Sequence, residues 1–188
     1  MMYNQPLDTA KSLIKNQGQN SRNMFGTCGL CQCANILRLA GVTDVTEDDV
    51  INVALSSSPE VVRQLEMDNP DPNYRGGTST AGRQEIMDRY NLQTEVYHIL
   101  SNREMSVAGL GERVASGHGV IVSVEAGVLW NDPDVQGGHA ISLISVSESG
   151  DRFVYSDTGT GRIGVISATR LGQALTGRPA NVTKGIIR

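Results

Sequence analysis

The sequence has few of the residues that cross-link or rigidify small folds. Aromatic residues make up only 4% of its 188 residues, with a single Trp, and there are three cysteines. All three cysteines lie between Cys28 and Cys33. Cysteines this close together cannot join distant parts of a chain, which argues against a disulfide scaffold. Reduced thiols in a cytosol-like compartment fit this pattern better.

Three longer patterns are also missing. Lys and Arg are scattered and the net charge is −4, so no basic patch favours nucleic acid as a partner. No apolar run approaches the length of a membrane span, and the first residues lack the apolar core of a signal peptide. We therefore expect a protein that lies in the cytoplasm or is delivered into a target cell by other means.

The composition is sufficient for a globular core. The apolar fraction is 39%, and 21 glycines indicate many turns. The chain contains neither an internal repeat nor a low-complexity linker, so the simplest prediction is one domain over residues 1–188. Residues 1–22 are polar and rich in Asn and Gln, which is typical of an arm, with one helix predicted from Leu7 to Lys15.

Helix signals dominate the first half of the chain. Thr27 is a favourable N-cap residue and Gly41 a typical helix stop, which predicts a helix from Cys28 to Ala40 with a buried stripe. Thr46 and Asp49 have nearly the spacing of a capping box at the start of a second helix. Further helices are predicted to begin near Pro59, near Thr80 and after Ser106, with a loop from Asn69 to Thr78.

Strand signals follow in the second half. Gly119 to Glu125 is β-branched and mostly apolar, as expected of a buried strand. The other predicted elements are strands at His139–Val146, Arg152–Ser156 and Arg162–Ile166, a helix from Ser167 to Leu175, and an edge strand at Val182–Ile187. Helices first and antiparallel strands later predict an α+β domain.

Cys28 occupies the position of an activated thiol. It lies in the first turn of its predicted helix, where unpaired N–H groups and the helix dipole favour the thiolate. The same N–H groups can bind an oxyanion. Gly29 would leave the sulfur accessible, whereas Cys31 and Cys33 lie deeper in the helix and are expected to be core residues.

Two other chemistries would use the same cysteines. Cys28 and Cys31 form a Cys-x-x-Cys pair, which can be redox-active at a helix start, although residues 21–27 before it are not strand-like. Zinc could be bound by the three cysteines and a histidine, although no second Cys or His pair has zinc-knuckle spacing. A redox or zinc-binding module without hydrolase activity is therefore the alternative prediction. Otherwise we expect neither a metal nor a cofactor.

His139 and Asp157 are predicted to face each other on neighbouring strands. If the turn between the strands spans residues 147–151, His139 lies opposite Gly159, two residues beyond Asp157. The two side chains are then diagonal neighbours on one face, about 7–8 Å apart at Cα. The carboxylate could orient the imidazole and stabilise its charged form. This pattern predicts a catalytic triad of Cys28, His139 and Asp157.

An oxyanion hole usually combines the N–H of the nucleophile with a side-chain amide. Several amide side chains lie just upstream of Cys28, and the sequence pattern does not choose among Gln17, Gln19, Asn20 and Asn23.

These segments resemble the papain-like superfamily of cysteine hydrolases. Within it, they are most similar to the bacterial papain-fold toxin and effector domains, some of which are glutamine deamidases, and to the bacteriocin-leader-processing peptidases. The resemblance rests on Cys28, Cys31 and Ala34 at a helix start, on Gly138-His139-Ala140 at a strand start, and on Asp157-Thr158-Gly159 at a strand end. It implies a papain-like fold with Cys28 as the nucleophile, His139 as the base and Asp157 as the orienting group.

Two positions depart from the patterns of these families. Papain-type enzymes have Gln six residues before the nucleophile, where this chain has Arg22, so the resemblance leaves Gln19 or Asn23 for the oxyanion hole. The deamidases have an Asp-x-Gln-Thr-Gly motif, and this chain lacks that Gln after Asp157.

The resemblance implies hydrolysis of an amide C–N bond in a protein or peptide substrate, by proteolysis or by glutamine deamidation, which share every chemical step. We expect the loops 69–78 and 129–136 to line the groove, with Trp130 and Gly138 in contact with substrate. Trp130 fits equally well as a core anchor. The implied biological role is that of a bacterial toxin or effector domain with a cognate immunity protein.

Overall fold

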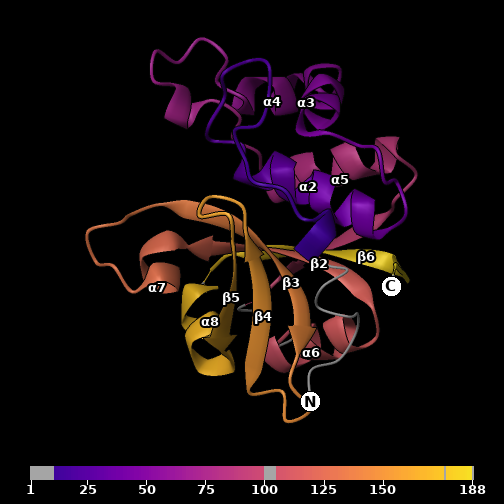
Figure 1. The fold of residues 1–188 in the computed structure, drawn as a ribbon, viewed down its shortest axis with the longest axis vertical. Coiled ribbons are helices and arrows are strands. Elements are labelled where there is room, and N and C mark those ends of the chain that lie inside the picture. Colours follow the sequence, from indigo (N-terminus) through magenta and orange to yellow (C-terminus); the bar gives the residue numbers. More distant parts are fainter. Residues whose placement is uncertain (1–10, 100–104, 176, 188) are drawn as a thin grey trace.

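A computed structural model describes residues 11–99, 105–175 and 177–187, which form a helical lobe and a sheet lobe (Figure 1). The helical lobe contains α2 (Cys28–Leu39), α3 (Glu47–Leu55), α4 (Pro59–Gln64), η1 (Pro72–Tyr74) and α5 (Thr80–Arg89). The sheet lobe contains β1 (Thr94–His98), α6 (Val107–Ala115), β2 (His118–Glu125), α7 (Ala126–Trp130), β3 (Gly138–Val146), β4 (Arg152–Asp157), β5 (Arg162–Ser167), α8 (Ala168–Ala174) and β6 (Pro179–Ile186). The predicted α+β class, with helices first and an antiparallel sheet last, is confirmed.

Local capping signals place most helix ends where the sequence predicts them. Thr46 and Asp49 form the capping box of α3. Gly41 adopts a φ of 98° just after α2, as a left-handed helix stop requires. The predicted side-chain cap at Thr27 is wrong, because its hydroxyl donates to the Glu47 carboxylate instead and leaves the start of α2 without a side-chain cap.

The six strands form one antiparallel sheet in the order β1-β6-β2-β3-β4-β5. The prediction of an edge strand at Val182–Ile187 is wrong, because β6 pairs with both β1 and β2. The buried part of β6 begins earlier, at Ala180, and its exposed residues lie only at its far end. The predicted segment included this exposed end and omitted the buried residues Ala180 and Asn181.

Helices cover both faces of the sheet and create two cores. α2 and α5 pack on one face, whereas α6 and α8 pack on the other (Figure 1). Along β2, Ile121 joins the core on the α2 side, and Val120 and Val122 join the opposite core. This burial on both faces explains why β2 is mostly apolar instead of strictly alternating.

The helix α2 lies at the centre of the molecule, and its residues from Gly29 to Leu39 are all buried. The prediction that only one face of this helix is buried is therefore wrong, because all of its faces are covered. Gln32, inside this helix, donates to the Ser156 carbonyl at 2.9 Å and accepts from the Ser142 hydroxyl at 2.6 Å. These bonds join the helix to β3 and β4. Buried polar groups with satisfied partners hold a unique arrangement of the elements they connect.

The ends of the chain add two observations. The predicted helix Leu7–Lys15 begins outside the described residues, and residues 11–13 are helical. The described part of the predicted arm is anchored, since Glu47 accepts the backbone N–H groups of Gly18 and Gln19. In the part of the chain that the structure describes, every helix is too short or too polar to cross a lipid bilayer.

Candidate active site

The strands β3 and β4 bring His139 and Asp157 together. Nε2 of His139 lies 2.8 Å from Oδ1 of Asp157, and both side chains are buried. The same carboxylate oxygen accepts the N–H of Gly159 at 2.9 Å. A Cβ at Gly159 would lie 3.2 Å from Cε1 of His139, so the absence of a side chain there keeps space around the imidazole.

The predicted register holds near the site and fails at the turn. Ser142 pairs with Ser156, as predicted. At the turn, Val146 faces Phe153 instead of Arg152. The register shifts between residues 143 and 145, and this β-bulge absorbs the extra residue. The site therefore keeps the predicted pairing although the turn geometry differs.

Cys28, the first residue of α2, lies beside His139. Burial raises the pKa of the Cys28 thiol, but its hydrogen bond to His139 and the charge of that imidazole bring the pKa below its ordinary value. Burial lowers the pKa of His139, whereas Asp157 and Cys28 raise it to about 9. Because Nε2 is bound to Asp157, Nδ1 is the ring nitrogen left for the thiol. These shifts favour a thiolate beside an imidazolium.

Asp157 completes the charge pattern. Burial raises its pKa, but the hydrogen bond and charge of His139 and the bond from Trp130 lower it to about 2. The carboxylate therefore stays ionised at neutral pH and can hold the imidazole in one orientation.

Cys31 and Cys33 are in a different environment. Both are buried, and burial raises the pKa of Cys33 to about 12 and that of Cys31 well above its usual range. The Cys31 thiol donates to the Lys15 carbonyl at 3.3 Å. Both thiols therefore stay protonated at neutral pH. No three His, Cys, Asp or Glu side chains within the described ranges are arranged to hold a metal ion.

Trp130 contacts both members of the His–Asp pair. Its ring centroid lies 5.1 Å from that of His139, with the two planes tilted by 49°. Its Nε1 donates to Oδ2 of Asp157 at 2.8 Å, the oxygen that His139 does not use. The indole is 37% exposed. Trp130 thus covers the pair, and its exposure contradicts the core-anchor interpretation, whereas its contact with substrate stays a prediction.

Gly138, predicted to contact substrate, is the exposed first residue of β3. A Cβ there would lie 2.7 Å from a guanidinium nitrogen of Arg178. Arg178 in turn forms an ion pair with Glu125, the strand partner of Gly138. A side chain at this position would therefore displace the ion pair.

Among the upstream amides, Gln17 is bonded to the turn that follows Asp157. Its Oε1 accepts from the Thr158 hydroxyl at 3.0 Å and lies 3.6 Å from the position of a Cβ at Gly159. Its Nε2 donates to the Phe25 carbonyl at 2.6 Å. Gln17 therefore joins the segment before the nucleophile to the turn after Asp157.

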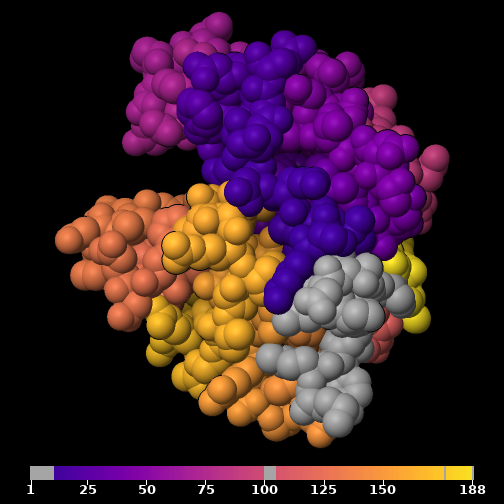
Figure 2. Space-filling model, viewed as in Figure 1, coloured from indigo at the N-terminus to yellow at the C-terminus, as the bar shows by residue number. Residues whose placement is uncertain are grey.

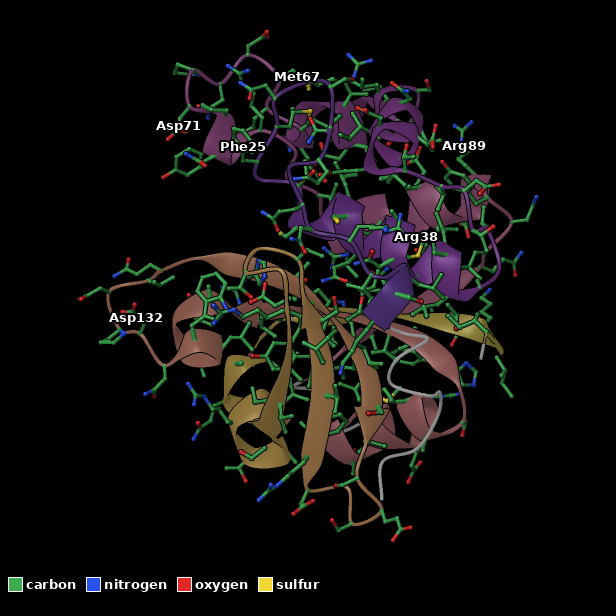
Figure 3. The ribbon with its side chains drawn as sticks, in the orientation of Figure 1. Phe25, Arg38, Met67, Asp71, Arg89 and Asp132 are labelled. Atoms are coloured by element: carbon green, nitrogen blue, oxygen red, sulfur yellow. The ribbon has the colours of Figure 1, made fainter. Side chains whose placement is uncertain are left out.

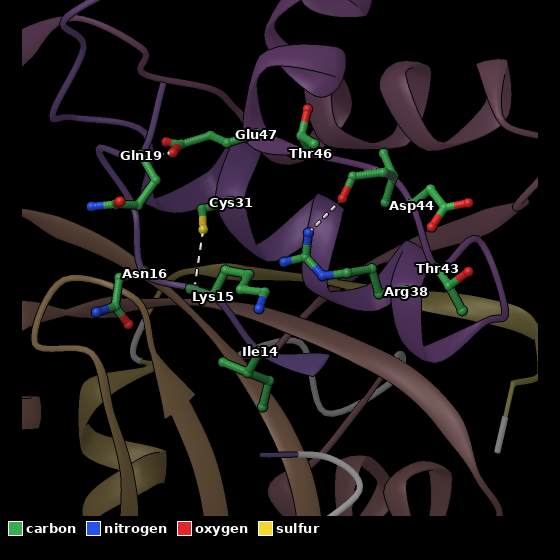
Figure 4. A pocket seen from close by; sticks show the side chains of 11 residues that line it. Ile14, Lys15, Asn16, Gln19, Cys31, Arg38, Thr43, Asp44, Thr46 and Glu47 are labelled. Atoms are coloured by element: carbon green, nitrogen blue, oxygen red, sulfur yellow. Dashed lines mark hydrogen bonds between the residues drawn. The ribbon is translucent and has the colours of Figure 1, made fainter. Parts of the chain in front are cut away.

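The two predicted oxyanion candidates lie elsewhere. The exposed Gln19 lines a cavity of about 610 Å³ together with Cys31 and Arg38 (Figure 4). Asn23 is exposed in a turn with a left-handed φ of 54°. An oxyanion donor must lie near the nucleophile, so the role of these two amides stays a prediction.

A hollow separates the two lobes in the space-filling view (Figure 2). The loop 69–78 of the helical lobe lies on one side, and residues 126–136 of the sheet lobe lie on the other. Figure 3 shows Phe25 and Asp71 above the hollow and Asp132 below it. The two loops predicted to line a groove therefore face each other across an open cleft.

Comparisons with known proteins identify the fold of this chain. No protein-family model matches the chain. Uncharacterized proteins of Mycobacterium tuberculosis and Mycobacterium bovis are 24% identical over 176 residues, which covers 85% of this chain and 72% of theirs. The crystal structure of a Bacillus anthracis protein assigned as a C39-like peptidase aligns with a TM-score of 0.60 at 14% identity, over 94% of this chain and 96% of that one. The chain has the papain-like fold.

A second solved structure, that of the Pseudomonas avirulence protein AvrPphB, aligns over 94% of this chain at 16% identity with a TM-score of 0.33, too low to add to the comparison.

Within the papain-like fold, the sequence analysis missed the residues that position Cys28. Gln32 follows the cysteine by four positions and therefore shares its helix face, a signal that was available. Glu47 binds Thr27, the residue before Cys28. Glu47 is one of three acids in the first turn of α3, which indicate favourable interaction with the helix dipole, so nothing in the pattern pointed to this second role. Arg83, a buried cation near the same helix, gave no sequence signal.

Proposed function

We propose that this protein is a cysteine hydrolase that cleaves amide C–N bonds, and that its substrates are peptides or proteins. The observation that carries the proposal is the placement of Cys28 at a helix start beside an imidazole whose Nε2 lies 2.8 Å from the Asp157 carboxylate. Nucleophile, base and orienting group in this order form the arrangement needed for covalent acyl transfer. The papain-like fold agrees with this chemistry.

The reaction follows from the charges of the site. The Cys28 thiolate attacks the carbonyl carbon, and a new C–S bond forms as the carbonyl oxygen becomes an oxyanion. The N–H groups at the start of α2, which lacks a side-chain cap, can donate to that oxyanion. Gln17 is a candidate for an additional amide donor. The C–N bond then breaks, and the imidazolium of His139 gives its proton to the leaving nitrogen.

The second half regenerates the enzyme. A water molecule gives its proton to the now neutral His139 and attacks the thioester, which releases the acid and the Cys28 thiolate. Asp157 stays ionised and holds the imidazole throughout. Trp130 shields the His–Asp pair from water on one side, which strengthens the hydrogen bond between them.

Proteolysis and glutamine deamidation share these steps and differ in the leaving group. The open cleft between the lobes favours an extended peptide, so peptidase activity is our first proposal (Figure 2). Incubation with a peptide library distinguishes the two reactions, since new N-termini appear in one case and free ammonia with conversion of Gln to Glu in the other.

The decisive test is the reactivity of the thiols against pH. Iodoacetamide should label Cys28 well below pH 8.5, about the pKa of a free thiol, and mass spectrometry should locate the label. The His139→Ala variant should lose this low-pH labelling, whereas Cys31 and Cys33 should stay unlabelled in both folded proteins. Slow labelling of all three cysteines, indifferent to His139, would overturn the proposal. Bound zinc or a reversible Cys28–Cys31 disulfide would then favour the metal or redox alternative.

The toxin or effector role, with an immunity partner that covers the Cys28 cleft, is a prediction from resemblance. Expression of the wild-type chain in a bacterial cytoplasm, beside the Cys28→Ala variant, tests it. Growth arrest that depends on Cys28 is expected. Equal growth of both strains, without a neighbouring gene for an inhibitor, would argue against this role.

A further inference from the structure

Arg83 is a buried cation held entirely by neutral oxygen atoms. It lies on α5 and is 2% exposed. Its Nε donates to Asn181 Oδ1 at 2.9 Å, and its Nη2 donates to Ser123 Oγ at 2.8 Å and to Thr80 Oγ1 at 3.0 Å. No carboxylate among the described residues lies within ion-pair distance of it. A buried charge without a counter-ion is costly, and proteins retain it where it has a use.

The guanidinium lies against the first turn of α2. A Cβ at Gly29, the residue after Cys28, would lie 3.3 Å from Nη1 of Arg83 and 2.2 Å from the Thr78 hydroxyl oxygen. Glycine at this position therefore permits the close approach of the charged group. The positive charge of Arg83 adds to the positive end of the helix dipole at the same turn.

The ionisable groups that act on Cys28 come from several elements. His139 reaches it from β3 and Arg83 from α5, and both lower the pKa that burial raises. Cys31, on the same helix, is protonated at neutral pH. Asp157 on β4 acts through His139, and Glu47 on α3 is bound to the Thr27 hydroxyl and backbone N–H groups. Among these groups, Arg83 is thus the one that brings a permanent positive charge to the start of α2.

We propose that Arg83 is a positioning residue of the active site, a fixed positive charge that favours the thiolate form of Cys28. The inference rests on the proposed function, since it assigns a partner to the nucleophile of that reaction. Asn181 on β6 and Ser123 on β2 hold the guanidinium, so the sheet lobe locks a charge from the helical lobe beside the nucleophile. The thiolate is then stabilised from two sides, by the titrating imidazole and by the permanent guanidinium.

The chain contains a matched control in Arg38. This arginine is also buried, and it donates to the Leu13 and Val45 carbonyls and to Asn35 (Figure 4). The groups near its charge are Cys31 and Glu47, not Cys28. Loss of either arginine removes a buried cation and its hydrogen bonds, but only loss of Arg83 should change the nucleophile.

The experiment is the pH profile of Cys28 labelling by iodoacetamide in the full chain. In Arg83→Gln, the labelling rate below the wild-type midpoint should fall about tenfold, as expected when an opposite charge is withdrawn from an ionisable group. Arg83→Lys should restore part of the loss, because it keeps the charge without the fork of donors. Arg38→Gln should leave the profile unchanged, even where urea denaturation shows a similar loss of stability.

A second variant covers the case in which Arg83→Gln does not fold. Ser123→Asp places a carboxylate at a half-buried position already bonded to Arg83, which neutralises the charge and keeps the guanidinium. It should raise the pH midpoint of Cys28 labelling. An unchanged midpoint in Ser123→Asp, or equal shifts in Arg83→Gln and Arg38→Gln, would overturn the role of Arg83 and leave the proposed function intact. An ordinary thiol profile in the wild type would overturn both.

Discussion

The two lobes contribute to the candidate site in different ways. The helical lobe supplies Cys28 as the first residue of a helix, so the position of the nucleophile is given by one element. The sheet lobe supplies His139 and Asp157, which come from different strands and meet only through their register. The comparison teaches that the position of the nucleophile is local, whereas its activation requires the two lobes to be docked on each other.

Two cysteines of α2 show the same contrast between local position and tertiary environment. Cys28 and Cys31 are separated by less than one turn, yet the pKa of the first thiol is lowered and that of the second is raised. Burial raises both values. The largest opposing influence is His139, which the sheet lobe brings to Cys28, whereas the charge of Glu47 raises the pKa of Cys31 further.

The largest expected effect separates the cysteines. Cys28→Ala should lower amide hydrolysis by at least about 1,000-fold, because the covalent route is lost. Cys31→Ala should retain most activity, since that thiol is protonated and bonded to the Lys15 carbonyl. Hydrolysis of a peptide library, with new termini counted by mass spectrometry, measures both. Equal losses in the two variants would contradict the contrast between the cysteines.

The next effect concerns the sheet lobe. Asp157→Ala should lower kcat by about 100-fold, because the imidazole loses its orientation and part of its charge stabilisation. The raised pKa of His139, about 9, should fall towards its ordinary value of 6.5. The alkaline limb of the rate profile should therefore move to lower pH, since the imidazolium is lost earlier as pH rises. Asp157→Asn serves as the control, because its amide oxygen can still accept from Nε2–H.

A third change weakens the joint between the lobes. Gln32→Leu should lower the free energy of unfolding by about 1–3 kcal/mol, because the Ser156 carbonyl and the Ser142 hydroxyl lose their buried partner. Urea denaturation measures the loss. Gln173→Leu, at an exposed position of α8, should change stability by less than about 0.5 kcal/mol. A neutral Gln32→Leu would show that this amide does not hold the lobes together.

The smallest effect sharpens the role of Trp130. Trp130→Phe keeps a ring over His139 but removes the donor to Asp157 Oδ2, and should lower kcat by up to about tenfold. KM should change little if the indole acts on the His–Asp pair. A rise in KM with unchanged kcat would instead return Trp130 to its predicted place in the substrate wall. Tyr97→Phe, which removes a hydroxyl bonded to Glu95 on the edge strand β1, is the control for a generic loss of polarity.

Much of the helical lobe and the pairing at the site could be predicted from sequence. Capping residues act through bonds to neighbours a few positions away, so Thr46 and Gly41 marked their helix ends correctly. The register near His139 was also predicted correctly, although the turn was misplaced by one residue. A β-bulge between residues 143 and 145 shifts the register by one residue, and no sequence pattern indicated this bulge. The position of β6 inside the sheet was missed. The order of strands in a sheet depends on the path of the chain between them, which the sequence of a single strand does not indicate.

The sequence by itself indicated that Cys28 would begin a helix, although the expected Thr27 cap does not form. It also indicated that His139 and Asp157 would face each other, because strand alternation is a short-range property. Only the tertiary structure decided which side chains surround the nucleophile. Gln17 and Arg83 reach the start of α2 from other segments, and Gln32, inside α2, bonds outward to β4. Their roles come from burial and from partners distant in sequence. Electrostatic and hydrogen-bond energies depend on distance in space, which spacing along the chain does not specify.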